Sequence, residues 1–176
     1  MELSEELVAR IRRVRLFLCD VDGVMTDGTV LMGGGIELKR FDIRDGFCLR
    51  LLQQEGIRVG WISARPSEAT TERARDLKID FVRQSPAPKV EVVAALLAEL
   101  DLAWDEICYL GDDIIDLGVL KRAGFSAAPS DAQPEARTQA LYVCRHPGGR
   151  GAVREVVELI LKTHGRWEAL VAKFAS

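Results

Sequence analysis

A short apolar run that ends in acids constrains this chain more than any other feature. The run Leu16–Cys19 has the length of a buried strand, and two acids, Asp20 and Asp22, follow it at once. Gly23 and the later Gly28 break the strand pattern, so both acids come at its carboxyl end. Open α/β sheets bind their ligands at that end of their strands. Two neighbouring carboxylates repel each other, and a hard cation such as Mg²⁺ would relieve the repulsion through oxygen ligands.

The rest of the chain alternates between strand-like and helix-like segments. A helix over 5–13 precedes the first strand, which the pattern predicts at 15–20. Further strands are predicted at 57–62, 80–82, 107–110, 125–128 and 141–144, and helices at 67–77, 88–100, 114–123, 135–139 and 152–162. This order predicts an α/β fold, a Rossmann-like three-layer parallel sheet with right-handed crossovers and helices on both faces.

One segment departs from this alternation. Residues 29–41 read as a β-hairpin, because a turn of three glycines, at 33–35, precedes an arm of alternating apolar and polar residues. Residues 42–46 then lead into a helix that ends near Glu55, with Gly56 after it. We therefore expect a hairpin flap just after the first strand.

Size and charge exclude several classes of protein. The 176 residues fit one domain, and the net charge of −3, without a basic stripe, argues against nucleic-acid binding. We expect no membrane attachment, because no apolar stretch reaches spanning length and the acidic start lacks the apolar region of a signal peptide. Widely spaced cysteines are expected to be reduced core residues of a cytoplasmic protein: Cys19, Cys48, Cys108 and Cys144.

Polar residues follow or precede other predicted elements in the same way. Ser63 and Arg65 follow strand 57–62, and Lys89 lies in the first turn of helix 88–100. Three acids follow strand 107–110: Asp112, Asp113 and Asp116. Parallel strands bring their carboxyl ends to one edge of a sheet, so we expect these groups to converge on Asp20 and Asp22.

This set of side chains suits phosphoryl transfer. One carboxylate can attack phosphorus, and a second can protonate the leaving alcohol and later accept a proton from water. A hydroxyl and a lysine can hold the phosphoryl oxygens, while a metal bound by acids neutralises the developing charge. The acids at 112, 113 and 116 also have a plainer interpretation, since acids at a helix N-terminus complement the helix dipole.

The segment Asp20–Thr26 resembles the first motif, D-x-D-G-x-x-T, of the haloacid dehalogenase-like (HAD) phosphatases. Ser63, Lys89 and the segment Gly111–Asp116 match the other three motifs of that family in the same order. The resemblance implies that Asp20 is the nucleophile and a Mg²⁺ ligand. It implies a general acid/base role for Asp22, which would also bind the metal through its backbone carbonyl. The other implied roles are metal ligation by Asp112, phosphate or substrate binding by Ser63, Lys89, Arg65 and Thr26, and support by Asp113 and Asp116.

The spacing of these motifs leaves no room for a cap domain, because only 41 positions separate Asp22 from Ser63 and 26 separate Ser63 from Lys89. Residues 26–28, 41–46 and 148–155 make the chain similar to capless phosphatases of 3-deoxy-D-manno-octulosonate 8-phosphate (KDO 8-phosphate), from about Val14 to His164. This resemblance implies an enzyme of lipopolysaccharide synthesis that works as a homotetramer. It also implies that the hairpin packs on neighbouring subunits and that residues 148–176 reach an adjacent active site.

The sequence departs from the family pattern at two places. The second motif reads Ser63-Ala64-Arg65 where the family usually has Thr-Gly-Arg, but the hydroxyl expected to bind phosphate is kept. Two prolines precede Lys89 in place of a glycine and a polar or acidic residue, and this stiffer loop leaves the substrate open. One alternative is a phosphatase of a nine-carbon sugar acid 9-phosphate, although the glycine-rich segment at 148–151 favours the eight-carbon acid. The other is an oligomeric module without catalysis, against which the intact acids of the first and fourth motifs argue.

Overall fold

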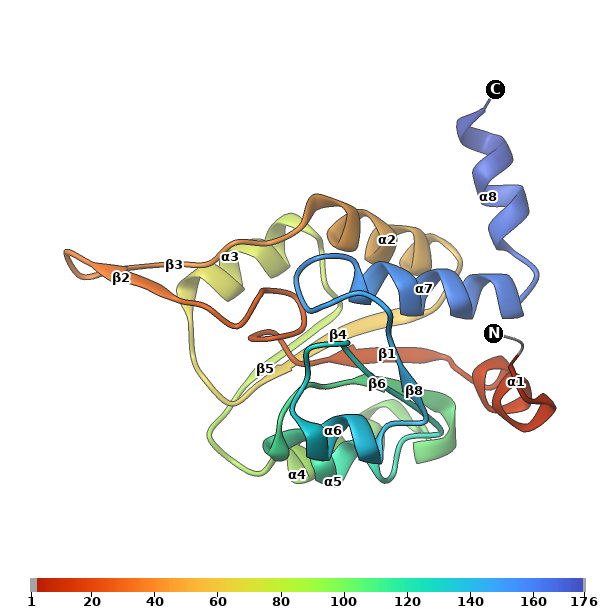
Figure 1. Cartoon of the computed structure of the whole chain (residues 1–176), viewed down its shortest axis with the longest axis horizontal. Helices are drawn as coiled ribbons and strands as arrows, with labels where there is room; N and C mark the ends of the chain where they lie inside the picture. The colour runs from red at the N-terminus through yellow and green to blue at the C-terminus, as the bar shows by residue number, and fades with distance from the viewer. Residues whose placement is uncertain (1–2, 176) are drawn as a thin grey trace.

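A six-stranded parallel sheet lies between two layers of helices in the computed structural model, which describes residues 3–175 (Figure 1). The strand order is β5-β4-β1-β6-β7-β8, and every registered pair in it is parallel. From β1 the chain builds one side of the sheet and then crosses to the other, so the carboxyl end of β1 is the switch point where such sheets bind ligands. The strands are β1 (Leu16–Cys19), β4 (Arg58–Ser63), β5 (Phe81–Gln84), β6 (Ile107–Leu110), β7 (Phe125–Ala128) and β8 (Tyr142–Val143).

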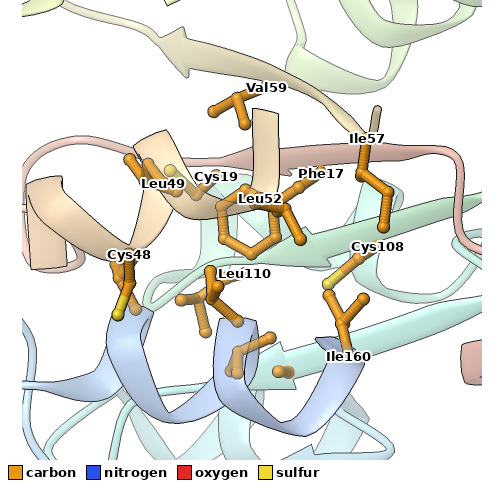
Figure 2. Packing of buried hydrophobic residues seen from close by; sticks show 14 of the residues in the cluster. Phe17, Cys19, Cys48, Leu49, Leu52, Ile57, Val59, Cys108, Leu110 and Ile160 are labelled. Atoms are coloured by element: carbon orange, nitrogen blue, oxygen red, sulfur yellow. The ribbon is translucent and has the colours of Figure 1, made fainter. Parts of the chain in front are cut away.

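Two apolar cores hold the layers together, one on each face of the sheet. Successive residues of β1 point to opposite faces, so Phe17 and Cys19 enter one core while Leu16 and Leu18 enter the other. The first core is covered by α2 (Ile43–Gln54) and α7 (Ala152–Thr163), whose buried side chains meet those of the sheet in Figure 2. The second lies under α4 (Lys89–Leu100), α5 (Leu117–Leu120) and α6 (Pro134–Gln139).

The structure confirms the predicted α/β class, and residues 3–175 contain no cap domain. The predicted helix 114–123 is wrong, because a 3₁₀ turn, η2 (Ile114–Asp116), precedes the single turn of α5. The Asp116 carboxylate turns back to accept hydrogen bonds from the backbone N–H of Asp112 and Asp113, which fixes a tight loop in place of a regular helix start. The remaining helices are α1 (Glu5–Arg12), α3 (Glu68–Asp76), η1 (Trp104–Glu106) and α8 (Trp167–Phe174).

The predicted hairpin is present and projects away from the sheet (Figure 1). Its arms, β2 (Leu31–Gly33) and β3 (Ile36–Leu38), are antiparallel and shorter than the sequence suggested. Four large apolar side chains are 58–71% exposed on it: Leu31, Met32, Ile36 and Leu38. Exposed apolar residues concentrated on one projection are typical of a surface that packs against another molecule.

The segment 148–176, expected to act as a tail, divides into two parts. Gly148 and Gly149 lie against the turn after β1, where a Cβ on Gly148 would come within 1.8 Å of the Gly23 carbonyl oxygen. Helix α7 then buries its apolar face completely in the first core. Residues 148–163 are thus an integral part of the folded domain, and deleting them would remove one face of the first core. Only α8, anchored by the buried Leu170, extends beyond it.

The cysteines lie in the core as predicted, since all four are buried and free. In the described part of the chain, no helix is both long and apolar enough to cross a bilayer.

Candidate active site

Asp20 is the first residue past β1 and is almost completely buried. Its Oδ2 lies 2.8 Å from Lys89 Nζ, and its Oδ1 accepts a hydrogen bond from the Val21 N–H at 2.7 Å. Burial raises the pKa of Asp20 to about 6, and the nearby Asp116 carboxylate adds to that effect while Lys89 opposes it. The carboxylate is therefore ionised near neutral pH but costly to keep so, which suits a group that reacts.

Asp116 organises the buried centre of the site. Its Oδ1 accepts hydrogen bonds from Lys89 Nζ at 2.7 Å and from the Tyr109 hydroxyl at 2.6 Å. Its Oδ2 accepts the backbone N–H groups of Asp112 and Asp113, at 3.1 and 3.2 Å. With four donors on two oxygens, this carboxylate positions the lysine and the loop after β6. Burial alone would lower the pKa of Lys89, but the carboxylates of Asp116 and Asp20 outweigh it and raise that pKa.

One carboxylate oxygen of Asp112 is left without a hydrogen bond. Its Oδ1 is buried and has no hydrogen-bond partner among the described residues. Burial, with the charges of Asp20 and Asp116, raises the pKa of Asp112 to about 8. The approach of this carboxylate depends on Gly23, where a Cβ would lie 2.1 Å from Asp112 Oδ2.

These carboxylates fit a divalent metal ion. Oxygens of Asp20, Asp112 and Asp116 lie within 4.8 Å of one another, and an all-oxygen set suits Mg²⁺. Because the Asp116 oxygens already accept four hydrogen bonds, Asp20 and Asp112 are the members with capacity left for an ion. An unpaired buried oxygen on a carboxylate of raised pKa is the signature of a site that needs a cation to balance it.

Asp22 turns its carboxylate toward the hairpin. Lys39, which follows β3, donates a hydrogen bond to Asp22 Oδ2 at 2.9 Å and lies 2.8 Å from Oδ1. The Asp22 side chain is about a quarter exposed, so it remains open to solvent at the switch point.

The second predicted motif lies at the end of β4, the strand paired with β1. Ser63 is buried there, and its hydroxyl donates to the Arg65 carbonyl oxygen and accepts from the Arg65 N–H. The Arg65 guanidinium forms an ion pair with Glu37 of the hairpin. Arg65 therefore lies between the end of β4 and the flap.

Thr26 and Asp113 occupy more local roles than expected. The Thr26 hydroxyl is fully buried and accepts hydrogen bonds from the N–H groups of Gly23 and Gly28, so it holds the turn after β1 together. The substrate contact expected of Thr26 stays a prediction. Asp113 caps η2 by accepting the N–H of Ile114 at 2.7 Å, which is the plainer interpretation given for an acid at a helix start.

Three polar residues at the site went unnoticed in the sequence: Lys39, Glu37 and Tyr109. Lys39 and Glu37 are two positions apart on one hairpin arm and so share a face, which was a usable signal. Nothing local indicated that this face meets Asp22 and Arg65. Tyr109 reads as an ordinary apolar strand residue until its hydroxyl is placed beside Asp116.

Comparisons with known proteins identify relatives of this chain. Residues 79–156 match the family model described as haloacid dehalogenase-like hydrolase. The chain is 41% identical to the 3-deoxy-D-manno-octulosonate 8-phosphate phosphatase of Yersinia pestis, over 94% of this chain and 89% of that protein. The chain is 39% identical to the protein of the same name in Escherichia coli K12, over 93% of this chain and 88% of that protein.

Solved structures extend the likeness to the whole fold. A crystal structure of the Moraxella catarrhalis 3-deoxy-D-manno-octulosonate 8-phosphate phosphatase, in complex with a magnesium ion, a phosphate ion and KDO, has a TM-score of 0.95 at 34% identity. It covers 98% of this chain and 99% of that one. On these grounds the chain belongs to the haloacid dehalogenase-like hydrolases and, among them, to the 3-deoxy-D-manno-octulosonate 8-phosphate phosphatase family.

Proposed function

We propose that this protein is a Mg²⁺-dependent phosphatase that hydrolyses KDO 8-phosphate to KDO and phosphate through an aspartyl phosphate on Asp20. The observation that carries the proposal is the buried cluster at the carboxyl end of β1, where the Asp20 carboxylate is paired with Lys89 and faces the unsatisfied Asp112. Family relatives with this substrate in their names support the choice of sugar acid.

In this mechanism Asp20 attacks the phosphorus and the bond from phosphorus to the sugar oxygen breaks. Asp22 gives its proton to that leaving oxygen, then accepts a proton from the water that attacks the aspartyl phosphate. The bond from phosphorus to the Asp20 oxygen then breaks, which releases phosphate and restores the Asp20 carboxylate. Lys89 and the Ser63 hydroxyl hold the phosphoryl oxygens, and the Asp116 carboxylate keeps Lys89 in place. A Mg²⁺ ion held by Asp20, Asp112 and the backbone carbonyl of Asp22 would supply positive charge to offset that of the phosphoryl group.

We further propose that the active form is a homotetramer in which the hairpin packs on neighbouring subunits. The exposed apolar residues of β2 and β3 support this, because they leave a projecting apolar surface in the single chain. We propose a cytoplasmic location, which the four free, buried cysteines support, because disulfides are rare in that reducing compartment. The substrate contacts that a cap would provide must then come from the hairpin, from Arg65 and from adjacent subunits.

Phosphate release by the Asp20→Asn variant tests the catalytic assignment. Loss of the nucleophile should lower kcat on KDO 8-phosphate by at least about 10³-fold. Thermal unfolding should change little, because Lys89 keeps Asp116 as its partner and the repulsion between Asp20 and Asp112 is removed. Asp76→Asn, at an exposed acid that ends α3, is the matched control. Near-normal turnover by Asp20→Asn would overturn the mechanism.

A comparison of kcat/KM between KDO 8-phosphate and a nine-carbon sugar acid 9-phosphate tests the substrate. A higher value for the nine-carbon acid would favour the alternative enzyme. Absence of turnover on both, and on an aryl phosphate with Mg²⁺, would favour the module without catalysis.

A further inference from the structure

We propose that Lys39 of the hairpin is a positioning residue for Asp22, so that the flap as well as the sheet sets the geometry of proton transfer. This inference rests on the general acid/base role proposed above for Asp22. The hairpin then has a second function beyond offering a surface to other molecules.

Lys39 is held in place on three sides. Its Nζ donates to Asp22 Oδ2 at 2.9 Å and to the Thr70 hydroxyl of α3 at 3.1 Å, and it lies 3.8 Å from Glu37 Oε1. The Lys39 side chain is 0% exposed and Thr70 is fully buried. A lysine ammonium without access to solvent is costly unless acceptors surround it, so this arrangement is specific to the folded flap.

The arm that carries Lys39 is itself anchored to the catalytic edge. Glu37, two residues earlier, pairs with the Arg65 guanidinium and accepts a hydrogen bond from the Ser67 hydroxyl at 2.6 Å. Both partners lie just after β4. Two contacts on one face of the arm thus fix where the Lys39 backbone sits relative to β1.

Asp22 depends on Lys39 for its orientation. Among residues 3–175, no other side chain donates a hydrogen bond to its carboxylate. Without that contact, the side chain is free to redistribute among its rotamers. Asp22 Oδ1 is buried and lacks a hydrogen bond of good geometry although Lys39 Nζ is 2.8 Å away. Lys39 Nζ thus lies within 2.9 Å of both carboxylate oxygens, which fixes the direction in which the Asp22 side chain points.

A direct substrate contact for Lys39 fits the structure less well. Its ammonium is enclosed by Asp22, Thr70 and Glu37 and has no surface to offer a ligand. A positioning role therefore predicts a defect in proton transfer, whereas a binding role predicts a defect in KM.

Leaving-group dependence provides the test. The alcohol of KDO 8-phosphate needs a proton in order to leave, while p-nitrophenolate leaves without one. Lys39→Met keeps the length of the side chain and removes its donors and its charge. We expect kcat and kcat/KM on KDO 8-phosphate to fall at least about 10-fold, a part of the 10²–10⁴ that general acid–base catalysis contributes. On p-nitrophenyl phosphate, kcat/KM covers only the steps up to release of p-nitrophenolate, before water attacks the aspartyl phosphate. Its loss should stay below about 3-fold, and Lys39→Arg should recover part of the larger loss.

Thr70→Val provides a second, milder variant should Lys39→Met fail to fold. It keeps the shape of the threonine and removes only the hydrogen bond that holds Lys39, so the same selective loss is expected at smaller size. Lys121→Met, at an exposed lysine that ends α5, is the matched control and should leave both rates unchanged.

Each outcome separates the inference from the function on which it rests. Asp22→Asn should show the same selective loss of kcat/KM on KDO 8-phosphate, and its failure to do so would overturn the role of Asp22 itself. If Asp22→Asn behaves as expected but Lys39→Met and Thr70→Val lose kcat/KM equally on both substrates, or on neither, Lys39 does not position the acid. A change confined to KM would likewise overturn the proposal in favour of substrate binding.

Discussion

Replacing Asp116 with asparagine should destabilise the protein strongly, although the two side chains have nearly the same shape. The native carboxylate accepts four hydrogen bonds, two on each oxygen. An asparagine amide has one oxygen, and its nitrogen is a donor. Whichever way it turns, one pair of donors then faces an N–H₂ group: Lys89 and Tyr109, or the N–H groups of Asp112 and Asp113.

The magnitude follows from these contacts. Each buried donor left without an acceptor costs about 1–3 kcal/mol, and breaking a buried ion pair costs about 3–5 kcal/mol. Lys89 keeps Asp20 as a second partner, 2.8 Å away, so its charge is not left isolated. We therefore expect a loss of about 3–4 kcal/mol in the free energy of unfolding, a large share of the ~5–15 kcal/mol typical of a domain.

Urea unfolding of the metal-free protein measures this loss, with Tyr109→Phe as the comparison. That variant removes a single donor and leaves the carboxylate, so a loss of about 1 kcal/mol is expected from it. A loss below about 1 kcal/mol for Asp116→Asn would refute the assignment of Asp116 as the organising carboxylate. A loss equal to that of Tyr109→Phe would show that the backbone and lysine contacts contribute nothing measurable.

Two further predictions concern the helix layer and the hairpin. Burial alone would raise the pKa of Glu155, but hydrogen bonds from Tyr142, from His146 and from the backbone after β8 lower it to about 2. The ionised Glu155 carboxylate therefore contributes its full stabilisation above about pH 4.5, and this stabilisation is lost as the pH falls toward 2. Glu155→Gln should cost about 2–3 kcal/mol at pH 7 and progressively less at pH 4 and pH 3 in urea unfolding, and a constant difference would contradict this. Met32→Glu with Ile36→Glu, two charges on the exposed hairpin, should convert the proposed tetramer to smaller species in sedimentation experiments, whereas an unchanged mass would exclude the hairpin as the interface.

The sequence alone determined the arrangement of the helix and sheet layers and the location of the candidate site at the strand ends. Leu16–Cys19 reads as a buried strand because each face needs apolar side chains, and the acids right after it must emerge at the strand end. The same logic located Ser63 and Asp112, since parallel strands share one carboxyl edge. These inferences depend only on the local pattern of apolar residues and on the order of the elements along the chain. Both can be read from the sequence.

Only the tertiary structure decided which donor pairs with each carboxylate. The pairing of Lys39 with Asp22, the four donors on Asp116 and the insertion of Gly148 beside Gly23 join segments that no local pattern connects. The break in the predicted helix 114–123 has the same origin, because Asp116 bonds back to its own loop while holding Lys89. Helix propensity is worth a few tenths of a kcal/mol per residue, and such buried contacts exceed it severalfold. The strand ends therefore follow from the sequence, whereas the partner of each carboxylate follows only from the packed structure.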